Sequence, residues 1–120
     1  MAKIFNLTQH NPTPAQAVEG VQAPLEGAKE LLNFETLPTQ GDVLRRAAKL
    51  ASLVASVGSQ GDRVMVGGAP YLMAPLVSNL KELGFCPVFS FTERRSVEKT
   101  NPDGSVTKTA VFEHIGWVEA

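Results

Sequence analysis

The sequence predicts an α/β fold: a small doubly wound three-layer sandwich of the Rossmann-like type, with a mainly parallel sheet and a C-terminal β-hairpin. Two observations lead to this prediction. Strand-like and helix-like segments alternate from the first residues to about residue 92, which is typical of a parallel sheet covered by helices. The segment from residue 93 to 118 is then rich in strand formers around a turn, which indicates a hairpin. Right-handed crossovers favour the strand order 2-1-3-4-5, with an α+β arrangement as the alternative.

The first third of the chain contains a strand, a short helix and a second strand. Residues 3–7 form the first predicted strand, and a turn-rich stretch follows. Thr13 is placed to cap a helix, with Pro14 at the first helical position and Gln16 completing a capping box. Gly20 should end this helix after about two turns. We interpret residues 21–30 as irregular and residues 31–34 as the second strand.

The middle of the chain alternates between helix and strand. Residues 41–57 should form a helix, because Val43, Ala47, Leu50, Val54 and Val57 recur at helical spacing. Residues 63–66 form an apolar strand, followed by Gly67-Gly68 and a helix that ends at Leu83. Pro75 should lie near the first turn of that helix, because a proline inside a helix costs about 3 kcal/mol. Residues 87–92 form the fourth predicted strand, and strand-like residues continue beyond it to Thr100. The turn 101–104 and a last strand from Ser105 to Val118 complete the hairpin.

Composition limits the possible functions. The 120 residues suit one domain, residues 1–120, and 11 basic against 12 acidic residues give a net charge of −1. This balance argues against binding of duplex DNA or of an anionic membrane. Cys86 is the single cysteine, which excludes an internal disulfide and a cysteine zinc cluster. No signal core, membrane-spanning segment, metal-ligand spacing or cofactor motif appears, so we expect a soluble cytoplasmic protein without metal or cofactor.

A candidate ligand site follows from the predicted strand order. Ligands bind at the carboxyl ends of parallel strands, where the strand order reverses. The loops at that point contain His10 and Asn11 after the first strand, and Gly67, Gly68 and Tyr71 after the third. Glycines allow backbone N–H groups to approach a ligand, and a helix N-terminus favours anions. The alternative is that the glycines serve only a tight turn and that the histidine orders its loop.

Two arginines extend this candidate site. Arg94 and Arg95 follow the fourth strand, and guanidinium groups suit phosphate oxygens. The alternative is a solvated hairpin with exposed charges. His114 in the last strand is interpreted as a packed or surface residue. No Ser-His-Asp order is evident, so the sequence indicates no catalytic residue.

A resemblance adds to this interpretation. Residues 4–16, which read Ile-Phe-Asn-Leu-Thr-Gln-His-Asn-Pro-Thr-Pro-Ala-Gln, resemble the opening of small bacterial proteins that have a strand, a histidine and Thr-Pro-x-Gln. Residues 67–70 add to the likeness. Some of these proteins are from phage or mobile-element neighbourhoods. Others are CRISPR-associated Rossmann-like proteins, related in shape to domains that sense cyclic oligoadenylate, and include ring nucleases. The resemblance implies a cyclic oligonucleotide ligand and assigns no catalytic residue, and the long terminal hairpin departs from the pattern.

Two classes of function remain open. The first is a small protein that binds a nucleotide or another phosphate-containing ligand, and that senses or acts on a cyclic oligonucleotide. The second is a non-enzymatic interaction protein of a phage or mobile element, which uses the hairpin to bind a partner or itself. The long final strand leads us to expect a homodimer. We also expect Gly68→Val to be more damaging than Gly58→Val, because Gly58 should lie in a forgiving turn.

Overall fold

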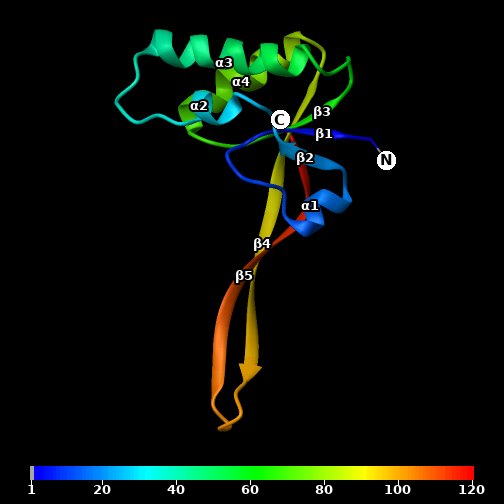
Figure 1. The fold of residues 1–120 in the computed structure, drawn as a ribbon, viewed down its shortest axis with the longest axis vertical. Coiled ribbons are helices and arrows are strands. Elements are labelled where there is room, and N and C mark those ends of the chain that lie inside the picture. Colours follow the sequence, from blue (N-terminus) through cyan, green and yellow to red (C-terminus); the bar gives the residue numbers. More distant parts are fainter. Residues whose placement is uncertain (1) are drawn as a thin grey trace.

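The computed structural model describes residues 2–120, which form a mixed, mostly parallel five-stranded sheet and four helices (Figure 1). The sheet order is β2-β1-β3-β4-β5, as predicted. Strands β2, β1, β3 and β4 pair in parallel, and β5 pairs antiparallel to β4. No described helix is long and apolar enough to cross a membrane. The elements are β1 (Ile4–Leu7), α1 (Pro14–Val18), β2 (Val21–Pro24), α2 (Ala28–Leu32), α3 (Gln40–Ala55), β3 (Arg63–Val66), α4 (Pro70–Glu82), β4 (Cys86–Thr100) and β5 (Val106–Glu119).

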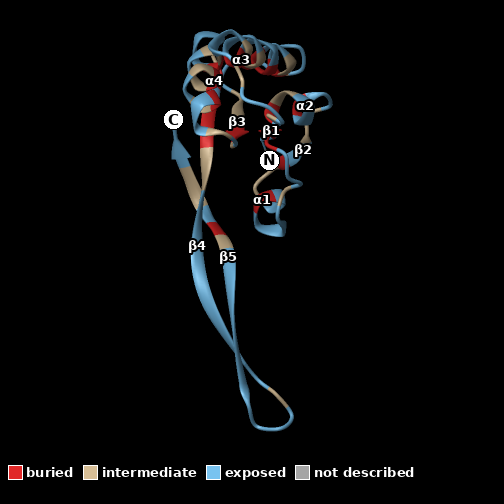
Figure 2. Ribbon diagram, turned by 90° about the vertical axis from the view of Figure 1, so that its left-hand side faces the viewer, coloured by how far each residue is buried: buried red, intermediate tan, exposed pale blue. Residues whose placement is uncertain are grey.

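The two faces of the sheet are covered unequally. Helices α2, α3 and α4 lie on one side, where they bury the main core, and α1 lies on the other side (Figures 1 and 2). On the α1 side the buried cluster is small, with Trp117 of β5 packed against Ile4, Val21 and Met65. The α/β class and the mainly parallel sheet are therefore confirmed. A doubly wound three-layer sandwich is not confirmed, because the third layer contains only the five residues of α1 among the described elements.

The second strand and the helix after it differ from the prediction. Strand β2 is Val21–Pro24, in the stretch interpreted as irregular, and residues 28–32 form α2 instead of contributing to a strand. Only Val21 of β2 is fully buried, so the strand lacks an alternating pattern, and Pro24 is tolerated because β2 is an edge strand. Short apolar runs do not distinguish strand from helix. Here Ala28 and Leu32 are four residues apart and both face the core.

Helix starts were easier to predict than helix interiors. Thr13 and Gln16 form the predicted capping box of α1, with both reciprocal hydrogen bonds present. Helix α4 begins at Pro70, so Pro75 is its sixth residue and lies inside the helix, not in its first turn. The carbonyl of Tyr71 consequently receives no N–H from the residue four positions later.

Gly58 does not lie in a forgiving turn. A Cβ atom built on it would lie 2.8 Å from Phe5 Cε2 and 3.0 Å from Phe85 Cε1. The backbone of Gly58 therefore packs against two aromatic rings of the core. Gly68 has φ of +149°, a conformation that strains any other residue, and a Cβ atom there would lie in ordinary contact with Met73 Cε at 3.6 Å and Leu32 Cδ2 at 3.7 Å. The expectation that Gly58 lies in a forgiving turn is wrong, because valine there would displace core rings. The ranking of the two substitutions stays a prediction.

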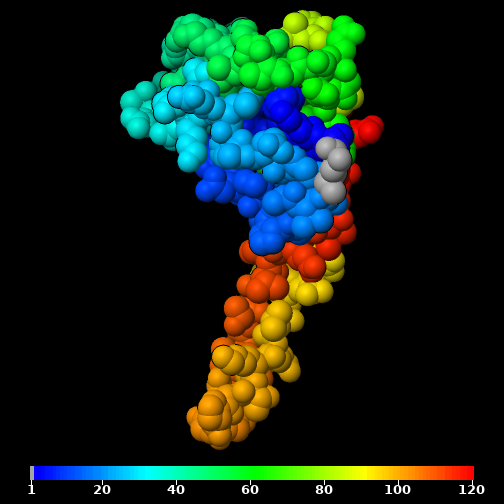
Figure 3. Space-filling view, turned by 45° about the vertical axis from the view of Figure 1, so that its right-hand side comes forward, coloured from blue at the N-terminus to red at the C-terminus, as the bar shows by residue number. Residues whose placement is uncertain are grey.

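The two strands of the C-terminal hairpin extend beyond the other three strands of the sheet. The predicted turn at Asn101–Gly104 is present, and β4 and β5 pair from Val88↔Glu119 to Thr100↔Val106. β4 pairs with β3 only as far as Val88. Beyond the body of the protein the two strands project as an isolated arm, which accounts for a longest extent of 57 Å (Figure 3).

Candidate functional site

A cleft of about 580 Å³ lies where the loops after β1 and β3 meet. These strands are neighbours, and their last residues, Leu7 and Val66, are paired in register. The loops that leave them are therefore adjacent, at the point where the strand order reverses. The lining residues are Thr8, Gln9, His10, Asn11, Thr13, Gln16, Met65, Val66, Gly67, Gly68, Phe89 and Ser90.

Four of the seven predicted ligand-binding residues line this cleft: His10, Asn11, Gly67 and Gly68. The fifth, Tyr71, does not line it. Its ring lies edge-on against Phe34, with the centroids 5.2 Å apart, and about half of the residue is exposed.

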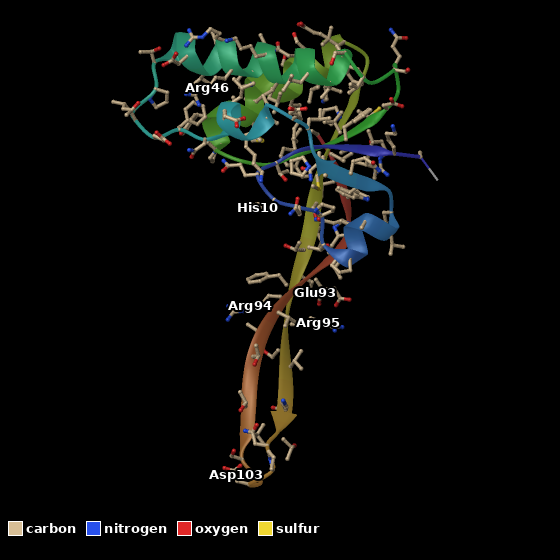
Figure 4. The ribbon with its side chains drawn as sticks, in the orientation of Figure 1. His10, Arg46, Glu93, Arg94, Arg95 and Asp103 are labelled. Atoms are coloured by element: carbon tan, nitrogen blue, oxygen red, sulfur yellow. The ribbon has the colours of Figure 1, made fainter. Side chains whose placement is uncertain are left out.

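Arg94 and Arg95 are not brought to the cleft. Both lie on the projecting arm, well beyond His10 (Figure 4). Arg95 forms an ion pair with Glu113 at 3.0 Å. The reason is that β4 does not end at the rim of the sheet. Val88 pairs with Met65, so the residue of β4 level with the glycine loop is Ser90.

The loop after β1 is fixed by the buried side chain of Asn6. Its Nδ2 donates to the carbonyl of His10 at 3.0 Å and to the carbonyl of Gln22 in β2 at 3.1 Å. Its Oδ1 accepts from the backbone N–H of Thr8 at 2.9 Å and from the Thr8 hydroxyl at 2.7 Å. All four hydrogen-bonding positions of the amide are thus used. Asn6 thus bonds the loop that carries the imidazole of His10 at two points, and the Thr8 hydroxyl adds a hydrogen bond from the His10 backbone N–H at 3.3 Å.

The loop after β3 lies directly against the loop after β1. A Cβ atom on Gly67 would lie 3.3 Å from Thr8 Cγ2, so the glycine permits this approach. Gly68, at φ +149°, turns the chain into α4. The N-cap residue of α4 is Ala69, which provides no side-chain hydrogen bond to the first helical turn. The positive end of this helix dipole therefore lacks a side-chain cap beside the cleft.

A chain of hydrogen bonds that the sequence did not reveal begins at Ser90, in the wall of the cleft. Gln16 Nε2 donates to Ser90 Oγ at 3.1 Å, and Ser90 Oγ lies 2.6 Å from His114 Nδ1. His114 Nε2 lies 2.9 Å from Glu19 Oε2, which also accepts from Trp117 Nε1 at 2.6 Å. The residues come from α1, the cap of α1, β4 and β5. They bring a serine, a histidine and a glutamate into sequential contact.

A β-bulge makes this chain possible. The register of β4 and β5 shifts between Phe91↔Gly116 and Thr92↔His114, which leaves Ile115 as the extra residue. In a regular strand, residues three apart face opposite sides. The bulge returns His114 to the face of Trp117, where the two rings lie 4.5 Å apart. The interpretation of His114 as a packed residue was incomplete: it is buried, and it is bonded at both ring nitrogens.

The surroundings of Glu19 favour its ionised form. The hydrogen bond from His114, assisted by that from Trp117 and by the nearby Arg63 guanidinium, holds the pKa of the Glu19 carboxyl below its ordinary value of 4.5. Partial burial opposes this effect without overcoming it. The carboxyl group is therefore a carboxylate at neutral pH, and it can only accept hydrogen bonds.

Comparison with known proteins identifies a family. The family model described as "Uncharacterized protein MJ1673 family" matches residues 2–118. No curated protein and no solved structure matches the chain.

The lowered pKa of Glu19 predicts a pH-dependent contribution to stability. Glu19→Gln should lower the free energy of unfolding at pH 7 by about 1 kcal/mol, because the carboxylate accepts two hydrogen bonds and is partly exposed. A depressed pKa stabilises the folded state above the ordinary value and loses this effect as pH falls through the folded value. The difference from wild type should thus shrink below pH 4.5. Urea unfolding across the pH range measures it, with the exposed Glu26→Gln as control. A difference that stays constant with pH would contradict the assignment.

Proposed function

The chain belongs to the MJ1673 family, and we propose that it binds a small phosphodiester-containing ligand, with a cyclic oligonucleotide as the favoured example. The observation that carries the proposal is the meeting of two loops, one with His10 and one with Gly67-Gly68, in a single cleft at the switch point of the sheet. Imidazole N–H groups, loop amides and the start of α4 can all donate to phosphate oxygens. The proposal includes a cytoplasmic location, which a chain with the single Cys86 suits.

The charge of the residues that line the cleft limits which phosphate-containing ligands it would bind. Among its lining residues, all within the described residues 2–120, none is Lys, Arg, Asp or Glu. A terminal phosphate carries close to two negative charges at neutral pH, whereas a phosphodiester carries one. One imidazole and a helix N-terminus suit the smaller charge better. Met65 and Phe89 provide apolar surface for a base beside it.

The resemblance of residues 4–16 to CRISPR-associated and ring-nuclease-related proteins favours a cyclic oligoadenylate within this class. Residues that carry the resemblance also build the cleft: Asn6 fixes the loop, and six others line it, namely Thr8, Gln9, His10, Asn11, Thr13 and Gln16. Whether the protein only senses such a ring or also opens it is a separate question.

The ligand proposal predicts selective thermal stabilisation. A cyclic oligoadenylate should raise the melting temperature of the protein more than ATP does, because each of its phosphates carries one charge. At a concentration 100 times its Kd, a ligand stabilises the protein by about 2.7 kcal/mol. His10→Ala should weaken binding about tenfold, the effect of losing one charge-assisted hydrogen bond. Arg94→Ala, on the arm, is the matched control and should bind as wild type does. Binding that depends on Arg94 and not on His10 would contradict the site.

A second candidate function rests on the arm. Among the described residues 2–120, no third strand pairs with its two strands over the segment from Thr92 to Glu113, and isolated two-stranded ribbons are only marginally stable in water. Apolar side chains are exposed along it, with Phe112 at 72% exposure, and also Val97, Val106 and Val111. Two ion pairs lie within the arm, Arg95–Glu113 at 3.0 Å and Glu98–Lys108 at 3.6 Å, and its four acidic and four basic residues leave it without net charge. A second copy of the arm would cover these apolar side chains without electrostatic repulsion between the two arms. We therefore propose a homodimer.

The dimer proposal predicts a concentration-dependent mass. Sedimentation equilibrium should give twice the mass of the chain at high concentration. Phe112→Ser should shift the equilibrium toward the monomer, because the most exposed ring of the arm would no longer be buried. Leu37→Ser, which removes a 96% exposed apolar residue outside the arm, should leave the mass unchanged. A monomer at every concentration would exclude self-association and leave a different partner protein as the occupant.

A further inference from the structure

We infer that Ser90 is an activated nucleophile, with His114 as its general base and Glu19 as the group that orients the base, and that it attacks the phosphorus of a phosphodiester bound in the cleft. The contacts that carry this inference are the 2.6 Å separation of Ser90 Oγ from His114 Nδ1 and the 2.9 Å separation of His114 Nε2 from Glu19 Oε2. A nucleophile bonded to a base, which is in turn oriented by a third group, is the arrangement that activates serine hydroxyls in unrelated folds. The choice of substrate rests on the proposed function, but the activation of Ser90 does not.

The direction of each hydrogen bond is determined by the two ends of the chain. Gln16 Oε1 accepts from the backbone N–H of Thr13 in the capping box, so its Nε2 faces Ser90 and donates. At the other end the Glu19 carboxylate only accepts, so His114 Nε2 carries a proton. In the neutral imidazole, Nδ1 is then unprotonated and accepts the hydroxyl hydrogen of Ser90. This is the tautomer that a general base requires.

The geometry exposes the nucleophile and protects the base. Ser90 lines the cleft together with the loop of His10 and the glycine loop. The side chain of His114 is only 2% exposed and lies behind it. The ring of Trp117 packs on the imidazole and donates to the same carboxylate oxygen. Because the base is shielded from water, its proton exchange is directed to the serine.

The proposed reaction is a hydrolysis in two steps. Ser90 Oγ attacks phosphorus while its proton passes to His114 Nδ1, and the bond from phosphorus to the leaving sugar oxygen breaks. That oxygen takes a proton from a water molecule in the cleft, because the buried His114 does not reach it, and a phosphodiester between the ligand and Ser90 remains. The hydroxide left from that water then attacks phosphorus. The bond between phosphorus and Ser90 Oγ breaks, and Oγ recovers its proton from His114. The net change is one phosphodiester and one water converted to a phosphomonoester and an alcohol.

Diisopropyl fluorophosphate tests the activation of Ser90 without requiring the ligand. The reagent forms a bond from phosphorus to an activated serine oxygen and releases fluoride. Mass spectrometry of digested wild-type protein should find the adduct on Ser90, and Ser90→Ala should remove it. His114→Gln should slow labelling about 100-fold, the loss expected when a general base is removed. Ser78→Ala, which removes an exposed serine of α4 outside the cleft lining, is the control and should label Ser90 at a rate close to wild type.

The results that would overturn the activation of Ser90 differ from those that would overturn the ligand proposal. Wild-type protein that gives no Ser90 adduct would overturn the inference, even if a cyclic oligoadenylate binds. A folded His114→Gln variant, checked by circular dichroism, that labels as fast as wild type would also overturn it. The class of substrate is tested with bis(p-nitrophenyl) phosphate, which should release p-nitrophenol and leave a phosphoryl adduct on Ser90. A Ser90 adduct in a protein that binds no cyclic oligonucleotide would instead reject the proposed ligand and retain the nucleophile.

Discussion

The buried amide of Asn6 is the interaction on which the candidate site depends. It lies near the end of the interior strand β1, is fully buried, and binds both the loop after β1 and the carbonyl of Gln22 in the edge strand β2. An amide buried without partners costs about 1–3 kcal/mol, so the loop and the amide stabilise each other. This loop leads through Thr13 into α1, and α1 positions Gln16 and Glu19. The cleft and the hydrogen-bond chain behind it therefore share one support.

The central part of the fold could be predicted from the sequence because its signals are local or depend on general rules. The capping box at Thr13 and the alternation of strands and helices led to the correct order of the sheet and to the adjacency of its two loops. The edge strand Val21–Pro24 could not be predicted in this way, since a single buried residue shows no alternation of apolar and polar positions. Strand β4 also continues beyond the predicted fourth strand. Its strand-like sequence runs on through Arg94, so the sequence does not show where β4 passes the rim of the sheet.

The site could be predicted only in part, for a physical reason. His10 and Gly68 adjoin the ends of neighbouring strands, and strand order places them. Ser90 and His114 depend on a register shift at Ile115, which no local property of the sequence encodes. The one available signal was His114 three residues before Trp117 in a predicted strand. It becomes informative only when the bulge is known, because a regular strand would point the two rings to opposite faces.

Amide hydrogen exchange of an Asn6→Asp variant tests the central claim most directly. Aspartate has almost the same shape as asparagine, but its carboxylate cannot donate to the carbonyls of His10 and Gln22. At pH 7 we expect exchange to accelerate in residues 8–11 and in β2, while α3 and α4 keep their protection. Unchanged exchange in residues 8–11 would show that other contacts hold the loop and that the cleft does not depend on Asn6.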